Sequence, residues 1–193
     1  MTERERADAA RNRQAILQAA DELFASAAAP GRVSMDDIAR AAGVGKGTLF
    51  RRFGDRTNLI RQVYAVRLRP LRAQVESGPP PLGPGTPPLE RVTAVLDGIA
   101  AVKLDNLHLT TALERASSGV SPESHFESPD YHDVHQLLTA LVTQHSRTAH
   151  AGWVAHVLLG AVRADLLRHL AEVDGMTAEQ IRAQLRTFVL KTL

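Results

Sequence analysis

Residues 34–53 are SMDDIARAAGVGKGTLFRRF, and this stretch decides the fold of the N-terminal part of the chain. Ser34 followed three residues later by Asp37 predicts a capping box at the start of a short helix, with Asp in place of the usual Glu or Gln. Gly43 is expected to end that helix, and a second short helix follows from about Gly45 to Phe53. Two short helices joined by a tight glycine turn predict a helix-turn-helix.

A helix-turn-helix places its second helix in the major groove of DNA, while its first helix crosses the backbone. Ala39, Val44 and Leu49 would hold the two helices together. Arginine can grip guanine edges with two hydrogen bonds, and threonine can contact a thymine methyl group. Two helices with a glycine turn also occur in ordinary bundles, so a solvated face stays open as the alternative. The residues that the exposed face would offer to DNA are Lys46, Gly47, Thr48, Arg51 and Arg52.

The sequence on either side of this motif predicts helices and no strands. Apolar residues at helical spacing before it predict a helix from about Asp8, as N-cap, to Ala28. Asp55 can cap the next helix, which runs toward Leu68 and which Pro70 would kink or end. We therefore expect an all-α fold. Its remaining helices are expected at about 89–104, 106–117, 131–146, 149–173 and 177–192.

Residues 78–88, GPPPLGPGTPP, form the one segment with the composition of a linker. Six of these eleven residues are proline, which fits neither a helix interior nor a strand ladder. A semi-rigid, extended connector is the expected state. A second break is expected at about residues 117–130.

The charge is distributed unevenly along the chain. Residues 1–69 hold 13 Lys or Arg against 8 Asp or Glu, while residues 70–193 hold 10 against 13. The N-terminal third is therefore the part expected to meet a polyanion. Arg4, Arg6 and Arg11 could follow the minor groove as an N-terminal arm, but interleaved acidic residues favour a solvated tail.

Several classes of protein are excluded by composition and by missing motifs. The 193-residue chain has no cysteine, which excludes disulfide scaffolds and thiolate metal sites. The start of the chain lacks the apolar core of a signal peptide, and no apolar stretch is long enough to span a membrane. No Ser–His–Asp arrangement, phosphate loop or dinucleotide fingerprint is present. We expect a cytoplasmic protein without catalytic residues or cofactors.

Residues 13–60 resemble the DNA-binding domain of the tetracycline-repressor (TetR) family of bacterial regulators. The resemblance implies two domains, a helix-turn-helix domain over residues 1–54 and an effector-binding and dimerisation domain over residues 55–193. The residues that carry it are Arg13 to Leu17, Ala20, Leu23, Phe24, Ser34 to Ala39, Ala42 to Val44, Lys46 to Phe50, Phe53 and Leu59.

The resemblance also implies roles for single residues. Lys46, Gly47, Thr48 and Arg52 would face the groove, and Ser34 and Arg56 would contact phosphates, helped at Arg56 by the start of the fourth helix. Phe50 stands where the family usually has Tyr, which removes one hydroxyl contact to phosphate. Gly45 stands where Ser is common, so the second helix of the motif is expected to lack a side-chain cap.

The final helices are predicted to form a dimer. Residues 151–169 are too widely apolar for burial on one side only, and such a helix needs both its own domain and a partner. The resembled family pairs two such helices with those of a second copy in a four-helix bundle. A helix buried at the centre of a monomer is the alternative. The expected dimer contacts are Leu158, Val162, Leu166, Ile181, Leu185 and Phe188.

An effector pocket is expected among the helices between about Leu89 and Trp153. His132 and His135 stand three residues apart and could share a metal ion, but ordinary surface or core histidines are the favoured interpretation, and we expect no metal. The residues expected to contact an effector are His108, Phe126, Tyr131, Trp153 and His156.

We therefore expect a homodimeric, ligand-responsive repressor that binds a palindromic operator in double-stranded DNA and is released by a small molecule. The alternative is a helical ligand-binding protein whose helix-turn-helix is inactive. A helical enzyme is a third possibility for which the sequence offers no catalytic residues. Salt-dependent, sequence-selective affinity for DNA separates the first possibility from the others.

Overall fold

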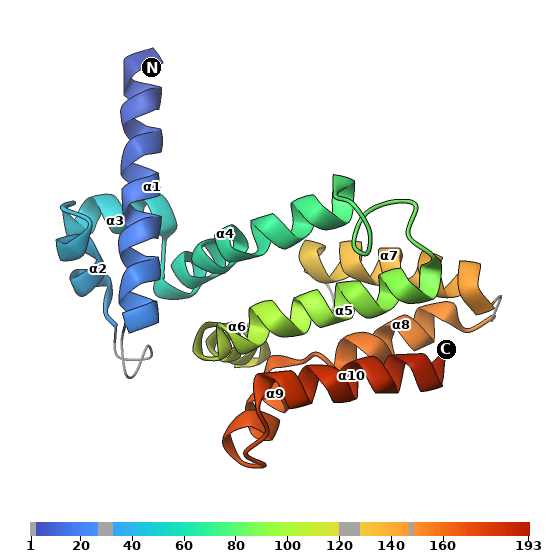
Figure 1. The fold of residues 1–193 in the computed structure, drawn as a ribbon. Coiled ribbons are helices and arrows are strands. Elements are labelled where there is room, and N and C mark those ends of the chain that lie inside the picture. The colour runs from blue at the N-terminus through green and yellow to red at the C-terminus, as the bar shows by residue number, and fades with distance from the viewer. Residues whose placement is uncertain (1–2, 27–32, 120–127, 147–148) are drawn as a thin grey trace. The chain divides into compact units, whose positions relative to one another are not determined.

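The computed structural model describes residues 3–26, 33–119, 128–146 and 149–193. All the regular structure in these residues is α-helical, which confirms the expected all-α class (Figure 1). The chain forms two compact units, residues 1–67 and 68–193, which share the long helix α4 (Arg56–Ser77). Within the described ranges, no helix is both long and apolar enough to cross a membrane.

The first unit contains α1 (Glu3–Ser26), α2 (Met35–Ala41), α3 (Lys46–Phe53) and the first half of α4. Helix α2 packs against both α1 and α3. The apolar spacing seen in the sequence becomes the core of this unit, because one face of each helix is turned inward. Its most deeply buried side chains are Ile16, Ile38, Leu49, Phe53, Leu59 and Val63.

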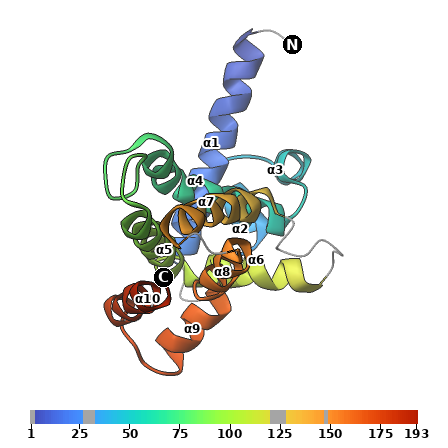
Figure 2. The ribbon, with the colours of Figure 1, turned by 90° about the vertical axis from the view of Figure 1, so that its right-hand side faces the viewer.

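Within the residues that the structure describes, the second unit contains the rest of α4 and six further helices. Helix α5 packs against α7 and α10, α7 packs against α8, and α6 packs against α9 (Figure 2). The bounds are α5 (Pro88–Leu104), α6 (Leu107–Gly119), α7 (Pro129–Ser146), α8 (Ala151–Gly160), α9 (Ala164–Glu172) and α10 (Ala178–Thr192).

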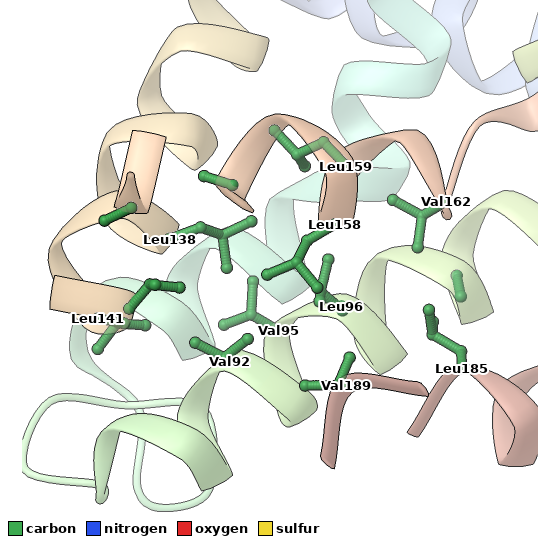
Figure 3. Close-up of a cluster of buried hydrophobic side chains, with 14 residues drawn as sticks. Val92, Val95, Leu96, Leu138, Leu141, Leu158, Leu159, Val162, Leu185 and Val189 are labelled. Carbon is green, nitrogen blue, oxygen red and sulfur yellow. The ribbon is translucent and has the colours of Figure 1, made fainter. Parts of the chain in front are cut away.

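The core of the second unit is aliphatic. Side chains of α5, α7, α8 and α10 meet in one cluster of buried residues, drawn in Figure 3. Val92 and Leu96 of α5 and Leu158 of α8 are fully buried there. Burying a side chain of this size contributes about 1.5–3 kcal/mol relative to leaving it in water.

Helices α1 and α4 are longer than the sequence predicted. Helix α1 begins at Glu3 rather than at Asp8, and Asp8 pairs with Arg11 inside the helix instead of capping it. Helix α4 continues through Pro70 to Ser77. A proline removes only one backbone donor from a helix, and a helix of this length retains bonds on both sides of it.

The prediction of an extended connector at residues 78–88 is wrong. The segment folds into successive turns, in which Gly83 donates its amide to Pro79 and the buried Thr86 donates its hydroxyl to Gly83. Arg91 closes these turns from α5, donating from Nε to the Leu82 carbonyl at 2.9 Å and from Nη2 to the Val75 carbonyl at 2.7 Å. Prolines cannot donate hydrogen bonds, but the Leu82 carbonyl among them and the Val75 carbonyl at the end of α4 both accept from the Arg91 guanidinium.

The prediction of a single helix over residues 149–173 is also wrong, because the helix is interrupted between α8 and α9. Arg163 adopts an extended conformation with φ −65° and ψ 140°. Asp165 accepts the backbone amide of Leu166 and two hydrogen bonds from the Arg163 guanidinium, at 3.0 and 2.9 Å. A local side-chain acceptor of this kind satisfies a free amide at a helix start and favours a new helix there.

Candidate nucleic-acid interface and ligand-binding unit

The motif at residues 34–53 folds as two helices with a tight turn. At the start of α2, the Ser34 hydroxyl accepts the amide of Asp37 and the Asp37 carboxylate accepts the amide of Ser34, both at 3.1 Å. This confirms the predicted capping box. The Ser34 hydroxyl also donates to the Asp37 carboxylate at 2.6 Å, and this bond, together with the one from the Ser34 amide, holds the pKa of Asp37 below its ordinary value. After α2, Gly43 takes a positive φ of 64°, which favours glycine, and the Val44 amide bonds back to Ala39.

The start of α3 presents backbone rather than side chain. Gly45 is the N-cap and, as predicted, supplies no side-chain hydrogen bond. A Cβ added to Gly47 would meet no atom within 4 Å, so the space beside the first turn is open. Exposed amides at a helix start attract anions, and Gly45 and Gly47 add no side chain that would hinder a phosphate there.

Lys46 is held at the same end of α3. Its Nζ lies 2.8 Å from Oδ1 of Asp36 on α2 and 5.9 Å from the centre of the Phe50 ring. Phe50 is 40% exposed, which is unusual for a phenylalanine in a folded domain. The sequence analysis missed Asp36 as a partner of Lys46, although its place in the first turn of α2 is visible in the sequence.

The two consecutive arginines of α3 have different surroundings. Arg51 is exposed. Arg52 is half-buried and donates from Nη1 to the carbonyl of Ala9 on α1 at 2.7 Å. Thr48 is half-buried, as Arg52 is.

Arg56 reaches back from the start of α4. Its Nε donates to the Val33 carbonyl at 3.0 Å, and its guanidinium lies 5.7 Å from the centre of the Phe24 ring. Burial lowers the pKa of Arg56 from its ordinary value without removing its charge at neutral pH. The residue before the capping box is thereby tied to α4, which fixes the entry to α2.

Helix α1 is fastened to α4 by polar contacts as well as by its apolar face. Arg13 donates to the side-chain carbonyl of Gln62 at 2.6 Å. Arg67 donates to both the carboxylate and the backbone carbonyl of Asp21. These contacts fix the position of α1 relative to α4, and α2 of the motif packs against α1.

In the second unit, Tyr131 and His156 from the predicted effector set lie together. The Tyr131 hydroxyl is 2.6 Å from Nδ1 of His156, and their rings stack with centres 5.8 Å apart. His135 joins them, with its ring centre 4.0 Å from that of His156 and its Nε2 3.0 Å from the Gly152 carbonyl. These three aromatic residues join α7 to α8.

The titration of this cluster is shifted by its surroundings. Burial and then the nearby His135 lower the pKa of His156 from its ordinary value. Burial raises the pKa of the Tyr131 hydroxyl, against the opposing charge of Arg163. Both shifts favour the uncharged forms of the two groups.

The other predicted effector residues are not part of this cluster as described. His108 is exposed on α6, Trp153 is 68% exposed on α8, and Phe126 lies outside the described residues. His132, the other half of the alternative metal pair, bonds to Gln136. Across the described ranges, no three potential metal ligands come together.

The six residues predicted at the dimer contact divide into two groups. Leu158, Val162, Ile181 and Leu185 are buried within the unit, so their side chains stabilise the protomer itself. Leu166 and Phe188 are 40% and 39% exposed and stay available to a partner. The sequence analysis missed four other exposed apolar side chains on or next to the same helices, which are Trp153, Val157, Val173 and Leu190.

An open groove of about 620 Å³ lies along α5 and α10 in the second unit. Leu89, Ala94 and Leu190 give it an apolar lining, and Asp97 and Arg186 stand at its polar side. Asp97 accepts from both Arg182 and Arg186, so these charges are already paired. No feature of the sequence had indicated this groove.

Part of the first unit matches a known protein family. Residues 16–63 match the model of a family described as bacterial regulatory proteins, tetR family. Over 190 residues, covering 97% of both chains, the sequence is 24% identical to a protein of Staphylococcus aureus (strain MRSA252) described as an HTH-type transcriptional regulator.

Solved structures share the fold over nearly the whole chain. A TetR transcriptional regulator from Rhodococcus sp. RHA1 matches with a TM-score of 0.63 and 21% identity, over 95% of this chain and 96% of that one. Thermus thermophilus FadR, a TetR-family transcriptional repressor solved with lauroyl-CoA, matches with a TM-score of 0.63 and 16% identity, over 92% and 93%. At these identities the likeness establishes the fold alone.

Proposed function

We propose that the chain is a transcriptional regulator of the TetR family and acts as a ligand-released repressor, because residues 16–63 match the model of that family and a regulator of Staphylococcus aureus is similar over nearly the whole length. Two copies would bind a palindromic operator, each placing α3 in a major groove. Half-sites would then lie about one helical turn apart, or slightly more. A small molecule bound by the second unit would favour a form that no longer fits this spacing.

The observation that carries the proposal is the exposed face of α3. Lys46 and Arg51 are exposed and bring positive charge to it, a Cβ added at Gly47 would meet no atom within 4 Å, and Thr48 is half-buried beside them. Ser34 is exposed at the start of α2, at the position to which the family resemblance assigns a phosphate contact. This combination supplies both phosphate contacts and base contacts, as sequence-selective binding requires.

The dimer is supported by the exposed apolar side chains of α8 to α10. Leu166 and Phe188 belong to this set and are 40% and 39% exposed. A second copy would cover them. Two linked DNA-binding domains also give far greater discrimination among sequences than one.

Selection of binding sites from random duplex DNA, by the full-length protein at low and moderate salt, tests the DNA-binding role. We expect enrichment of one inverted repeat, bound with strong salt dependence. No enrichment at either salt concentration would contradict the proposal and favour a ligand-binding protein with an inactive helix-turn-helix.

Sedimentation of the purified protein tests the dimer. Leu166→Glu together with Phe188→Glu should shift the protein toward monomer, because both charges would be buried at the contact. Val66→Glu is the matched control, since Val66 is 39% exposed but lies on α4. A wild-type monomer at micromolar concentration would contradict this part of the proposal.

Release by a ligand is tested on the selected duplex. Small apolar and amphipathic molecules are added to the preformed complex, with lauroyl-CoA included because FadR was solved with it. A releasing molecule should lower DNA affinity and, by linkage, bind the free protein more tightly than the complex.

A further inference from the structure

We propose that Arg52 is a positioning residue that fixes α3 against α1, and that Arg51 is the arginine of this pair that contacts DNA. The inference rests on the proposed function and deepens it. It differs from the role that family resemblance implies for Arg52, which is a contact in the groove.

The guanidinium of Arg52 is already engaged within the protein. Nη1 donates to the Ala9 carbonyl at 2.7 Å, and Nε is buried without a hydrogen-bond partner among the described residues. A guanidinium grips a base edge through one of two forks, Nη1 with Nη2 or Nε with Nη2. The pair of Nε and Nη2 cannot bind a base edge because Nε is buried. In the pair of Nη1 and Nη2, Nη1 already donates to the Ala9 carbonyl of α1.

The Ala9 carbonyl, which accepts the hydrogen bond from Arg52, belongs to helix α1. A helix carbonyl such as that of Ala9 keeps a lone pair free after its bond within the helix, so it can accept from Arg52 as well. Helix α1 is itself fastened to α4 through Arg13 and Gln62 and through Arg67 and Asp21. The Arg52 contact therefore joins α3 to a fixed element of the same unit.

The side chain of Arg51, the neighbour of Arg52, points in a different direction. Consecutive residues of an α-helix point about 100° apart, so Arg51 and Arg52 cannot both face α1. Arg51 is exposed, while Arg52 is half-buried. The exposed arginine is the one whose donors are open to phosphate or base edges.

Salt dependence separates the two roles. Each phosphate contact contributes about 0.9 to the slope of log affinity against log salt concentration. We expect Arg51→Met to lower the slope by about that amount. Arg52→Met should weaken binding by up to roughly tenfold, because the bound protein must then hold α3 in place without this charge-assisted hydrogen bond, and the slope should stay unchanged. The probe is the inverted-repeat duplex recovered by selection.

Two further variants complete the comparison. Arg52→Lys keeps one donor for the Ala9 carbonyl and should recover most of the lost affinity. Arg69→Met removes the same charge from an exposed site on α4 in the second unit and should leave affinity and slope unchanged. A loss of slope in Arg52→Met equal to that in Arg51→Met would overturn the inference.

Hydrogen exchange of the full-length protein without DNA gives a second, independent measurement. Arg52→Met should speed exchange of amides in α1 near Ala9, while Arg51→Met should not. Unchanged exchange in Arg52→Met would also overturn the inference. If the wild-type protein selects no DNA site, the proposed function fails, whereas the exchange result still decides whether Arg52 fixes α3 to α1.

Discussion

The ammonium group of Lys46, the first residue of α3, lies 2.8 Å from Oδ1 of Asp36 in the first turn of α2. Both side chains are more than half exposed, so the ion pair contributes little to stability. The ion pair instead reduces the positive charge that Lys46 of α3 presents to DNA. A phosphate that binds Lys46 must compete with a carboxylate already in contact with it.

Asp36→Asn should therefore strengthen binding to DNA. Removing the carboxylate frees Lys46 and takes one negative charge from the DNA-facing side, and we expect a gain of a few-fold, within the roughly 1 kcal/mol that exposed pairs reach. Titration of a labelled duplex measures it. Asp55→Asn, at an exposed site of the same unit, is the control for loss of a charge alone. Equal gains in both variants would contradict a specific role for the Lys46 pair.

Phe50→Tyr should also strengthen DNA binding. The ring is 40% exposed, so a hydroxyl can be added without being buried, and it restores a phosphate donor at the position where the family usually has Tyr. A neutral hydrogen bond is worth about 0.5–1.5 kcal/mol, or up to about tenfold in affinity. Because no charge is added, the salt slope should stay the same. Unchanged affinity for every duplex would show that Phe50 lies away from DNA.

Asp97→Asn should destabilise the second unit by about 1–3 kcal/mol, because Arg182 and Arg186 lose their shared carboxylate. Burial raises the pKa of Asp97, but the hydrogen bonds and charges of the two arginines hold it below its ordinary 3.8. The stabilisation is thus full above about pH 4 and disappears as the pH falls through the lowered pKa. Urea unfolding at pH 7 and pH 3 measures both effects.

The matched control for Asp97 is Asp130→Asn, which removes a carboxylate paired with Arg72 where both side chains are about half exposed. Its cost should stay below about 1 kcal/mol. Equal losses in the two variants would mean that the α5–α10 ion pairs contribute no more than a surface contact.

Acidification from pH 7.5 to pH 5.5 should weaken the contact between α7 and α8. The pKa of His156 is lowered, so its neutral form is the one that the fold stabilises. This contribution is full above the ordinary value of 6.5 and is lost as the pH falls through the lowered pKa. Thermal melting should show a smaller effect of pH on His156→Gln than on the wild type. His145→Gln, exposed on α7, should keep the wild-type response.

Much of the first unit could be predicted because its signals are local. The capping box of Ser34 and Asp37, the turn at Gly43 and the uncapped start at Gly45 each depend on residues within a few positions of one another. Such short-range rules act before tertiary packing is formed. The helix-turn-helix therefore follows from the sequence alone.

The contacts that refine the site could not be predicted in the same way. Arg52 and Ala9 are 43 positions apart, and Arg56 and Val33 are 23 apart. No periodicity links such pairs, and an arginine on a short helix has the same pattern whether it faces DNA or α1. The Tyr131, His135 and His156 cluster likewise depends on how α7 meets α8.

Two errors came from local rules that were outweighed by side-chain contacts. Proline content predicted an extended connector at 78–88, but Arg91 donates hydrogen bonds to the carbonyls of Leu82 and Val75 and thereby stabilises the turns. Apolar content predicted one helix over 149–173, but Asp165 satisfies the amide of Leu166 and starts a second helix. In both cases a single charged side chain decides the backbone path.

The closed turns at residues 78–87 affect how the chain can be cut. A protease needs several residues of extended, accessible backbone, and here the backbone is bent, carries prolines and is bonded to Arg91 and Thr86. Limited digestion should therefore leave this stretch whole, although its composition is that of a linker. Replacing Arg91 by a residue without donors would convert it into a site of cleavage.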